Sequence, residues 1–309
     1  MLEPSASAPS EPAAVALAQP GILAFGTTNH VYLELDLLPG ADLRTLPTVL
    51  ADFAGGVTTG AGFMLVVGFR PELWRQIDPA SCPEGVHGFD APIVGPDGFT
   101  MPATQHDVVL WLAGGARDVL FDGVQAALAA LAAHAVVADE ETGWAYRGHR
   151  DLTGFVDGTE NPKLVEVPRY ALYPEGPAAG ASLLLLQRWP HEPSWTKLSV
   201  AAQEAAIGRT KSDDRELDPK PETAHAARTD QDEIGKIVRR NMAYGTGVDH
   251  GTMFVGLTND QAVMQRMLER MAGVEGPRDE LTRHTRADTG AYYVLPPVAA
   301  LTAHCSTRR

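Results

Sequence analysis

Hydrophobic and polar positions follow the same order of elements in both halves of the chain. In the first half, four segments predict strands, because they alternate apolar and polar residues or form apolar runs near glycines: residues 30–37, 62–69, 106–115 and 136–148. Three segments carry apolar residues at helical spacing: residues 42–54, 71–77 and 116–135. Apart from the short helix 71–77, the order in this half is strand, helix, strand, then strand, helix, strand.

The second half repeats this rhythm. Four segments predict strands: residues 181–189, 236–245, 251–258 and 290–298. Two predict helices: residues 194–208 and 259–273. Residues 251–271 also echo residues 107–131, which suggests an internal duplication. Both halves indicate an antiparallel sheet covered on one face by helices, an α+β arrangement with its boundary near residue 150.

Three segments lie outside the repeated pattern. Residues 1–20 are rich in Pro, Ala and Ser and predict a flexible tail. Residues 79–102 are rich in Pro and Gly and predict a long excursion. Residues 208–235 are polar, with little periodicity, and contain His225. A loop of that length in a compact domain is usually functional or disordered.

Composition and charge narrow the classes of function. The chain has 309 residues, of which 44 % are hydrophobic and 21 % charged, as in ordinary soluble globular proteins. The net charge of −14 argues against binding to nucleic acid or to an anionic membrane. Only two cysteines occur, Cys82 and Cys305, which favours a reducing compartment. With no recognisable signal peptide and no apolar run of membrane-spanning length, we expect a cytoplasmic protein.

Asp157 stands in the glycine-flanked stretch "GFVDGTENP", residues 154–162. One interpretation is an Asx-type turn, in which the carboxylate caps nearby backbone N–H groups. The other is a carboxylate held rigidly at a cavity wall, where Phe155 and Val156 supply an apolar setting that raises its pKa toward the range of an acid–base catalyst.

His225 stands among small residues in "PETAHAARTD". A lone loop histidine is commonly a surface residue, but the alanines around this one would let a flat, planar cofactor approach. An imidazole that binds a metal also needs an acceptor on its other nitrogen. Asp288, just before the last predicted strand, is our candidate for that acceptor.

Arg239, Arg240 and Asn241 lie in the predicted strand 236–245. Because side chains alternate along a strand, Arg239 and Asn241 share one face and Arg240 points away. The simple interpretation is an ion pair between Arg239 and one of the many acids. The functional one is an electropositive wall for an anion or a polarised oxygen species.

Taken together, four separated stretches resemble the dye-decolourising peroxidase family, in particular its compact bacterial B-type subgroup. They are "GFVDGTENP", residues 183–217, "AHAARTD" and "IVRRNMAYG", in the order typical of the family. One local departure is Ala243, where proline is expected. The resemblance implies two ferredoxin-like domains, residues 21–150 and 151–309, and one haem b per chain in the second.

The resemblance also implies roles for individual residues. His225 would be the proximal ligand of the haem iron, and Asp157, Arg239 and Asn241 would lie on the distal side. Further residues match positions near the cofactor, the arginines close to the propionates: Arg228, Arg209, Gly158 and Thr159.

The implied activity is that of a haem peroxidase. Hydrogen peroxide would generate a ferryl intermediate, which would oxidise dyes, phenols or other one-electron donors. Two alternatives stay open at this point: a protein that carries haem or removes its iron, and a non-enzymatic α+β binding module, which would be colourless. The resemblance further implies a homo-oligomer, either a dimer or a hexamer.

Overall fold

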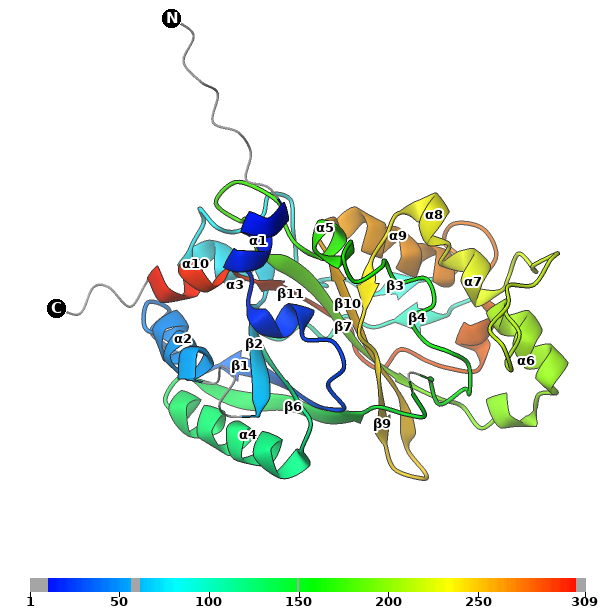
Figure 1. The fold of residues 1–309 in the computed structure, drawn as a ribbon, viewed down its shortest axis with the longest axis horizontal. Helices are drawn as coiled ribbons and strands as arrows, with labels where there is room; N and C mark the ends of the chain where they lie inside the picture. Colours follow the sequence, from blue (N-terminus) through cyan, green and yellow to red (C-terminus); the bar gives the residue numbers. More distant parts are fainter. Residues whose placement is uncertain (1–10, 57–61, 149, 304–309) are drawn as a thin grey trace, which may run out of the picture.

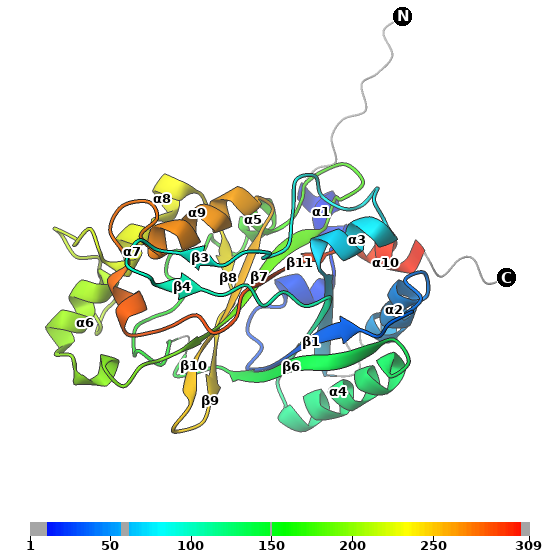
Figure 2. The same cartoon turned by 180° about the vertical axis from the view of Figure 1, so that it is seen from behind.

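Nine strands form one antiparallel sheet within the part of the chain that the structure, a computed structural model, describes: residues 11–56, 62–148 and 150–303 (Figures 1 and 2). The first half contributes β1 (Asn29–Leu37), β2 (Phe63–Phe69), β5 (Val108–Gly114) and β6 (Ala135–Trp144). The second contributes β7 (Ser182–Pro190), β8 (Val238–Arg239), β9 (Met242–Gly245), β10 (His250–Thr258) and β11 (Ala291–Leu295). The short strands β3 (Ile93–Val94) and β4 (Thr100–Met101) pair separately.

The same strand order occurs in both halves. In the first half the order across the sheet is β6-β1-β5-β2, and in the second it is β11-β7-β10, with β9 and β8 side by side along the outer edge of β10. Numbered along the chain, each half is ordered 4-1-3-2, the ferredoxin-like arrangement. The α+β prediction is therefore confirmed, and the repeated order agrees with an internal duplication.

The two half-sheets join at both edges. The last strand of each half pairs with the second strand of the other: β6 with β9, and β11 with β2. Because β7 pairs with both β11 and β10, the row of strands closes into a ring. A ring of this size has an interior that side chains fill.

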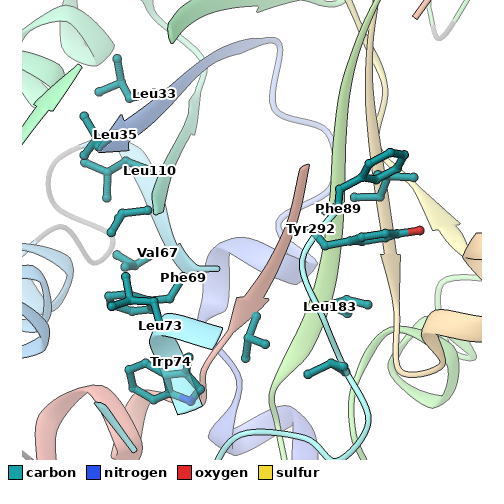
Figure 3. Packing of buried hydrophobic residues seen from close by; sticks show 14 of the residues in the cluster. Leu33, Leu35, Val67, Phe69, Leu73, Trp74, Phe89, Leu110, Leu183 and Tyr292 are labelled. Carbon is teal, nitrogen blue, oxygen red and sulfur yellow. The ribbon is translucent and has the colours of Figure 1, made fainter. Parts of the chain in front are cut away.

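Alternation along the strands separates two buried clusters. Leu33, Leu35, Leu183 and Leu185 belong to the larger cluster, which also receives helix side chains such as Trp74; Figure 3 shows part of it. Residues at the intervening strand positions point to the other face and pack together inside the ring: Tyr32, Trp111, Leu184, Leu186, Val255 and Tyr293. Each strand thus packs under helices on one face and into the ring on the other.

The helices gather mainly at the two ends of the molecule. Helices α2 (Leu46–Gly56) and α4 (Arg117–Leu131) lie at one end, and the helices α6 (Val200–Ile207), α7 (His225–Arg228), α8 (Gln231–Ile234) and α9 (Gln261–Met271) lie at the other (Figure 1). The remaining helices are short: α1 (Glu11–Leu17), α3 (Pro71–Ile77), α5 (Val167–Ala171) and α10 (Val298–Ala303). In the described residues, none is long and apolar enough to cross a membrane.

The structure corrects three predictions. Residues 11–20 are not a flexible tail, because α1 packs its buried Ala14 and Ala18 and the amide of Gln19 bonds to the backbone of Val67. The predicted strand 236–245 is interrupted, so it forms β8 and β9. The polar segment 208–235 contains α7 and α8, which are too short for the helical periodicity to be visible in the sequence.

Candidate active site

A mainly apolar pocket opens at the end of the molecule that holds α7 and α9. It encloses about 1230 Å³, counted to its open mouth. Apolar side chains from several elements line it: Phe155, Ile207, Ile237, Phe254, Met264, Met267, Leu268, Met271 and Leu281. The polar groups of this main pocket are fewer and include His225, Asp157, Arg239 and Asn241, which were all singled out from the sequence. A large apolar pocket with few convergent polar groups is typical of a cofactor site.

His225 presents an imidazole with one nitrogen already occupied. It is the first residue of α7, and its Nδ1 lies 2.6 Å from Oδ2 of Asp279. Asp279 is fully buried, and its other oxygen accepts the N–H of Leu281 at 2.9 Å, at the start of the 3₁₀ helix Glu280–Arg283. The carboxylate therefore fixes the tautomer, and Nε2 is the nitrogen available to a ligand.

The prediction that Asp288 accepts the hydrogen bond from His225 is wrong. Asp288 bonds to the guanidinium of Arg286 at 2.7 Å and lies 3.8 Å from that of Arg188. The acceptor is Asp279, which follows a turn after α9 and packs against α7 through the tertiary fold. The sequence signal was an aspartate that begins a helix, which indicates capping and gives no hint of the histidine 54 residues away.

Asp157 lies in a turn that requires a glycine at the next position, Gly158. Gly158 has a φ of +80°, a conformation that side-chain-bearing residues rarely adopt, so the turn favours glycine at this position. Burial raises the pKa of Asp157 above its usual value of 3.8, and nearby Asp151 adds to the shift. The positive charge of Arg239 and a hydrogen bond from Asn241 oppose it. The carboxyl is thus both a turn residue and a group suited to proton transfer.

Arg239 and Asn241 turn to the main pocket, as the alternation along the predicted strand requires. Oδ1 of Asn241 accepts the N–H of Val255 at 3.0 Å, which leaves its amide nitrogen for Asp157. Arg240 points the other way. Its guanidinium donates to the carbonyls of Gly21, Ile22 and Ala24 and lies over the ring of Trp111 at 4.4 Å.

Asn161 fixes the backbone of Arg239. Its Nδ2 donates to the Arg239 carbonyl at 2.8 Å, and its Oδ1 accepts the Arg239 N–H at 2.9 Å. The motif that carries Asp157 therefore also holds the backbone of Arg239, although the two are far apart in sequence. We assigned no role to Asn161 from the sequence, because its partner is a backbone brought close only by the fold.

Of the other residues expected to contact the cofactor, some line the main pocket and others do not. Arg209 and Thr159 line the main pocket, where Arg209 bonds to Asp214 at 2.8 Å and to Glu160 at 3.0 Å. Gly158 lies on a neighbouring cavity. Arg228 is buried and is not among the residues that line the main pocket, so its contact with the cofactor stays a prediction. Its guanidinium donates to the carbonyl of Arg270, in the last turn of α9 where the helix dipole favours a cation, and to the carbonyl of Glu275 beyond the helix.

A second cavity of about 1130 Å³, the side cavity, shares a wall with the main pocket. Asp157, Arg239 and Asn241 line both spaces. The outer part of the side cavity is lined by Phe25, Trp144 and Tyr146 among others. The polar cluster therefore stands between two spaces.

The donor set fits a planar, apolar cofactor bound through a metal. The main pocket offers one oriented imidazole and an apolar lining. Two buried donors that line it, Nε of Arg239 and Nε2 of Gln187, have no hydrogen-bond partner among the described residues. A buried donor without a partner costs about 1–3 kcal/mol, which a bound group can recover.

Comparisons with known proteins agree with this reading. The family model described as "Dyp-type peroxidase, N-terminal" matches residues 19–145, and "Dyp-type peroxidase, C-terminal" matches residues 148–300. A dye-decolorizing peroxidase of Mycolicibacterium paratuberculosis is 34 % identical over 297 residues, 90 % of this chain and 83 % of the relative. Another, from Brevibacterium linens, is 33 % identical over 86 % of this chain and 77 % of its own length.

Solved structures show the same relationship. The dye-decolorizing protein from V. cholerae has a TM-score of 0.83 and 33 % identity, covering 93 % of this chain and 99 % of its own. A variant of DypB from Rhodococcus jostii, solved in complex with heme, has a TM-score of 0.80 and 30 % identity, covering 89 % and 95 %. These matches support neither a haem carrier nor a binding module. The chain therefore belongs to the Dyp-type peroxidase family and is a haem peroxidase of the dye-decolourising type.

Proposed function

We propose that the main pocket holds one haem b per chain and that His225 binds its iron through Nε2. The observation that carries the proposal is the His225–Asp279 pair in a pocket that also contains Asp157, Arg239 and Asn241. A neutral imidazole that donates its other N–H to a buried carboxylate is a more basic ligand. A heme-bound Rhodococcus jostii relative supports the choice of cofactor.

Bound haem would supply the redox chemistry of the reaction. The protein groups supply proton transfer and charge. Ionised Asp157 takes a proton from one oxygen of hydrogen peroxide and returns it to the other, which leaves as water. Arg239 stabilises the negative charge that develops on the leaving oxygen. Asn241, held by the Val255 N–H, keeps its amide on the Asp157 carboxylate and fixes its orientation.

Arg209 is our candidate for the carboxylate groups at the edge of the cofactor. Of the two arginines expected near the cofactor, Arg209 and Arg228, Arg209 lines the main pocket. Asp214 and Glu160 hold its guanidinium in place. Thr159, whose hydroxyl donates to Asp214 at 2.6 Å, supports the same arrangement. The side cavity provides a route by which peroxide reaches the polar cluster without crossing the cofactor.

We further propose a cytoplasmic, homo-oligomeric enzyme that takes electrons from dyes, phenols or donors at its surface. The buried free thiol of Cys82 suits a reducing compartment. Leu164 and Val165, which are adjacent in sequence and expose 69 and 83 % of their surface, are our candidates for an apolar contact between copies. Sedimentation of the purified protein at several concentrations distinguishes a dimer or hexamer from a monomer.

The test of the proposed function combines a spectrum with a rapid-mixing experiment. Purified protein loaded with haem should show the absorption spectrum of a histidine-ligated ferric haem, and His225→Ala should lose it. Mixing with hydrogen peroxide should replace this spectrum by a new one. The original ferric spectrum should return when the enzyme oxidises a dye. A normal histidine-ligated spectrum in the His225→Ala protein would refute the ligand. A loaded wild-type protein that binds haem and ignores peroxide would refute the peroxidase.

A further inference from the structure

A second carboxylate, Asp151, lies beside Asp157. It lines both the main pocket and the side cavity and exposes 17 % of its side chain. Its carboxylate accepts the N–H of Thr153 at 2.7 Å and the hydroxyl of Thr252. Burial would raise the pKa of Asp151, but nearby His191 and these hydrogen bonds hold it below its usual value. Asp151 is therefore ionised and can only accept hydrogen bonds.

The hydroxyl of Thr252 sets the direction of the chain of hydrogen bonds. A hydroxyl has a single hydrogen, and that of Thr252 is donated to Asp151. The same oxygen lies 3.0 Å from Nε2 of His191, so it accepts and His191 donates. The order is His191 Nε2–H to Thr252 Oγ1–H to Asp151 Oδ2. Each member can pass a proton to the next and receive another behind it.

Strand pairing builds this arrangement. His191 directly follows β7, Thr252 lies on β10, and Thr252 pairs with Trp189 in the β7–β10 ladder. Two charged or titratable groups face His191: Asp151, with 3.8 Å between Oδ1 and Nε2, and His250, with 6.3 Å between ring centres. His250 begins β10 and leads to the exposed β9–β10 turn, residues 246–249.

The imidazole of His191 is buried, with 7 % of its side chain exposed. Burial lowers the pKa of His191, Asp151 opposes the change and His250 adds to it, so the ring is neutral near pH 7. A neutral ring has one N–H, and the bond to Thr252 assigns it to Nε2. Nδ1 is then the acceptor on the side away from Thr252.

The stoichiometry of peroxide reduction requires a supply of protons. Reducing hydrogen peroxide to two waters consumes two electrons and two protons. A donor that reacts at the surface, or that carries no proton, delivers electrons alone. The two protons must then come through the protein to the place where peroxide binds.

We propose that His191, Thr252 and Asp151 form a proton-transfer chain that supplies the peroxide-binding side of the main pocket. The inference rests on the proposed function for the location of the peroxide. These three are positioning and proton-transfer residues, and Asp157 and Arg239 remain the groups that contact peroxide.

The experiment compares Thr252→Val with Thr252→Ser in haem-loaded protein. Two rates are measured: reaction with peroxide alone, and reduction of the oxidised enzyme by ferrocyanide, which carries no proton. Thr252→Val should slow the ferrocyanide step about tenfold or more and leave the peroxide step within about twofold of the wild-type rate. Thr252→Ser, which keeps the hydroxyl, should restore the ferrocyanide step. Thr258→Val, a fully buried threonine on the same strand, controls for packing and should leave both rates unchanged. Ferrocyanide reduction at the wild-type rate in Thr252→Val would overturn the chain.

A readout independent of haem comes from ¹⁵N NMR of the protein without cofactor. His191 should carry its proton on Nε2 in wild-type protein and in Thr252→Ser, and its nitrogen shifts should change in Thr252→Val. A proton on Nδ1 in the wild type would overturn the assigned direction. If Thr252→Val does not fold, His191→Gln replaces it, and normal ferrocyanide reduction in that variant overturns the proposal. Failure of the wild-type enzyme to react with peroxide would instead remove the proposed function, leaving the NMR result unaffected.

Discussion

Nδ1 of His225 lies 2.6 Å from Oδ2 of Asp279, a carboxylate with no exposed surface. This contact occupies Nδ1 and so directs Nε2, the nitrogen proposed to bind the iron, into the main pocket. It also ties α7 to the turn after α9, so two elements of the main pocket are fixed by one hydrogen bond.

Asp279→Asn should weaken haem binding about 10- to 100-fold and raise the reduction potential of the bound iron, since an amide supports the imidazole less than a carboxylate does. The amide oxygen can still accept the N–H of Leu281, so the 3₁₀ helix is retained. Haem titration and potentiometry measure the two effects. Asp288→Asn is the matched control, because Asp288 contacts Arg286 and not His225. Equal behaviour of the two variants would contradict the assignment.

The reaction with peroxide should slow as the pH falls, with an apparent pKa above the usual aspartate value of 3.8, because burial favours the protonated form of Asp157. Asp157→Asn should abolish this pH dependence and slow the reaction about 100-fold. Arg239→Leu should raise the apparent pKa further, since it removes the positive charge that lowers it. Stopped-flow rates of the peroxide reaction between pH 4 and 8 give the apparent pKa of the wild type and of each variant. An apparent pKa that falls in Arg239→Leu would show that the arginine does not act on this carboxyl.

Asn161→Ala should impair the distal side without touching the ligand side. Loss of both bonds to the Arg239 backbone should cost about 1–3 kcal/mol of unfolding free energy and slow the peroxide reaction. Haem affinity should stay near that of the wild type. Asn259→Ala is a close control, because that side chain bonds to the carbonyls of Arg169 and Leu172. It should lower stability and leave the peroxide rate unchanged.

Glu34 should make stability depend on pH. It lies inside the ring with 4 % exposure and accepts the hydroxyl of Tyr293 at 2.5 Å. Burial raises its pKa from 4.5 to about 7, so the folded state holds the proton more tightly than the unfolded state. The resulting stability is present below pH 4.5 and is lost as pH rises through 7, a contribution of roughly 3 kcal/mol.

Urea unfolding at pH 5 and pH 8.5 measures this contribution. Glu34→Gln keeps an oxygen for Tyr293 and should show a smaller difference between the two pH values than the wild type. Glu140→Gln, an exposed position on β6, should match the wild type. An unchanged difference in Glu34→Gln would rule out Glu34 as the source.

The sequence predicted what depends on local periodicity, and failed where chain segments meet. Alternation along residues 236–245 correctly put Arg239 and Asn241 on one face, although the strand is broken between β8 and β9. Asp279 was missed because nothing local distinguishes it from Asp288; only the docking of α7 against the turn after α9 selects it. The contacts of Arg228 could not be predicted either, because its partners are the carbonyls of Arg270 and Glu275, which lie 42 and 47 residues away in the sequence.

The cluster of His191, Thr252 and Asp151 could not be predicted from the sequence either. Its members come from three segments, and the β7–β10 ladder brings two of them together. Such contacts depend on strand register, which periodicity does not determine.

The closed ring of strands has a consequence for the independence of the two halves. Every residue proposed to act on peroxide or iron lies after residue 150, yet the half that contains them ends in β11 and β9, whose outer partners, β2 and β6, belong to the other half. Cut from its neighbour, this half would expose two unpaired strand edges, which template aggregation or pairing with another copy. The ring is built as a symmetric dimer of like halves would be built, here within one chain. The first half is thus a permanent partner of the catalytic one, and a shortened enzyme would have to replace it.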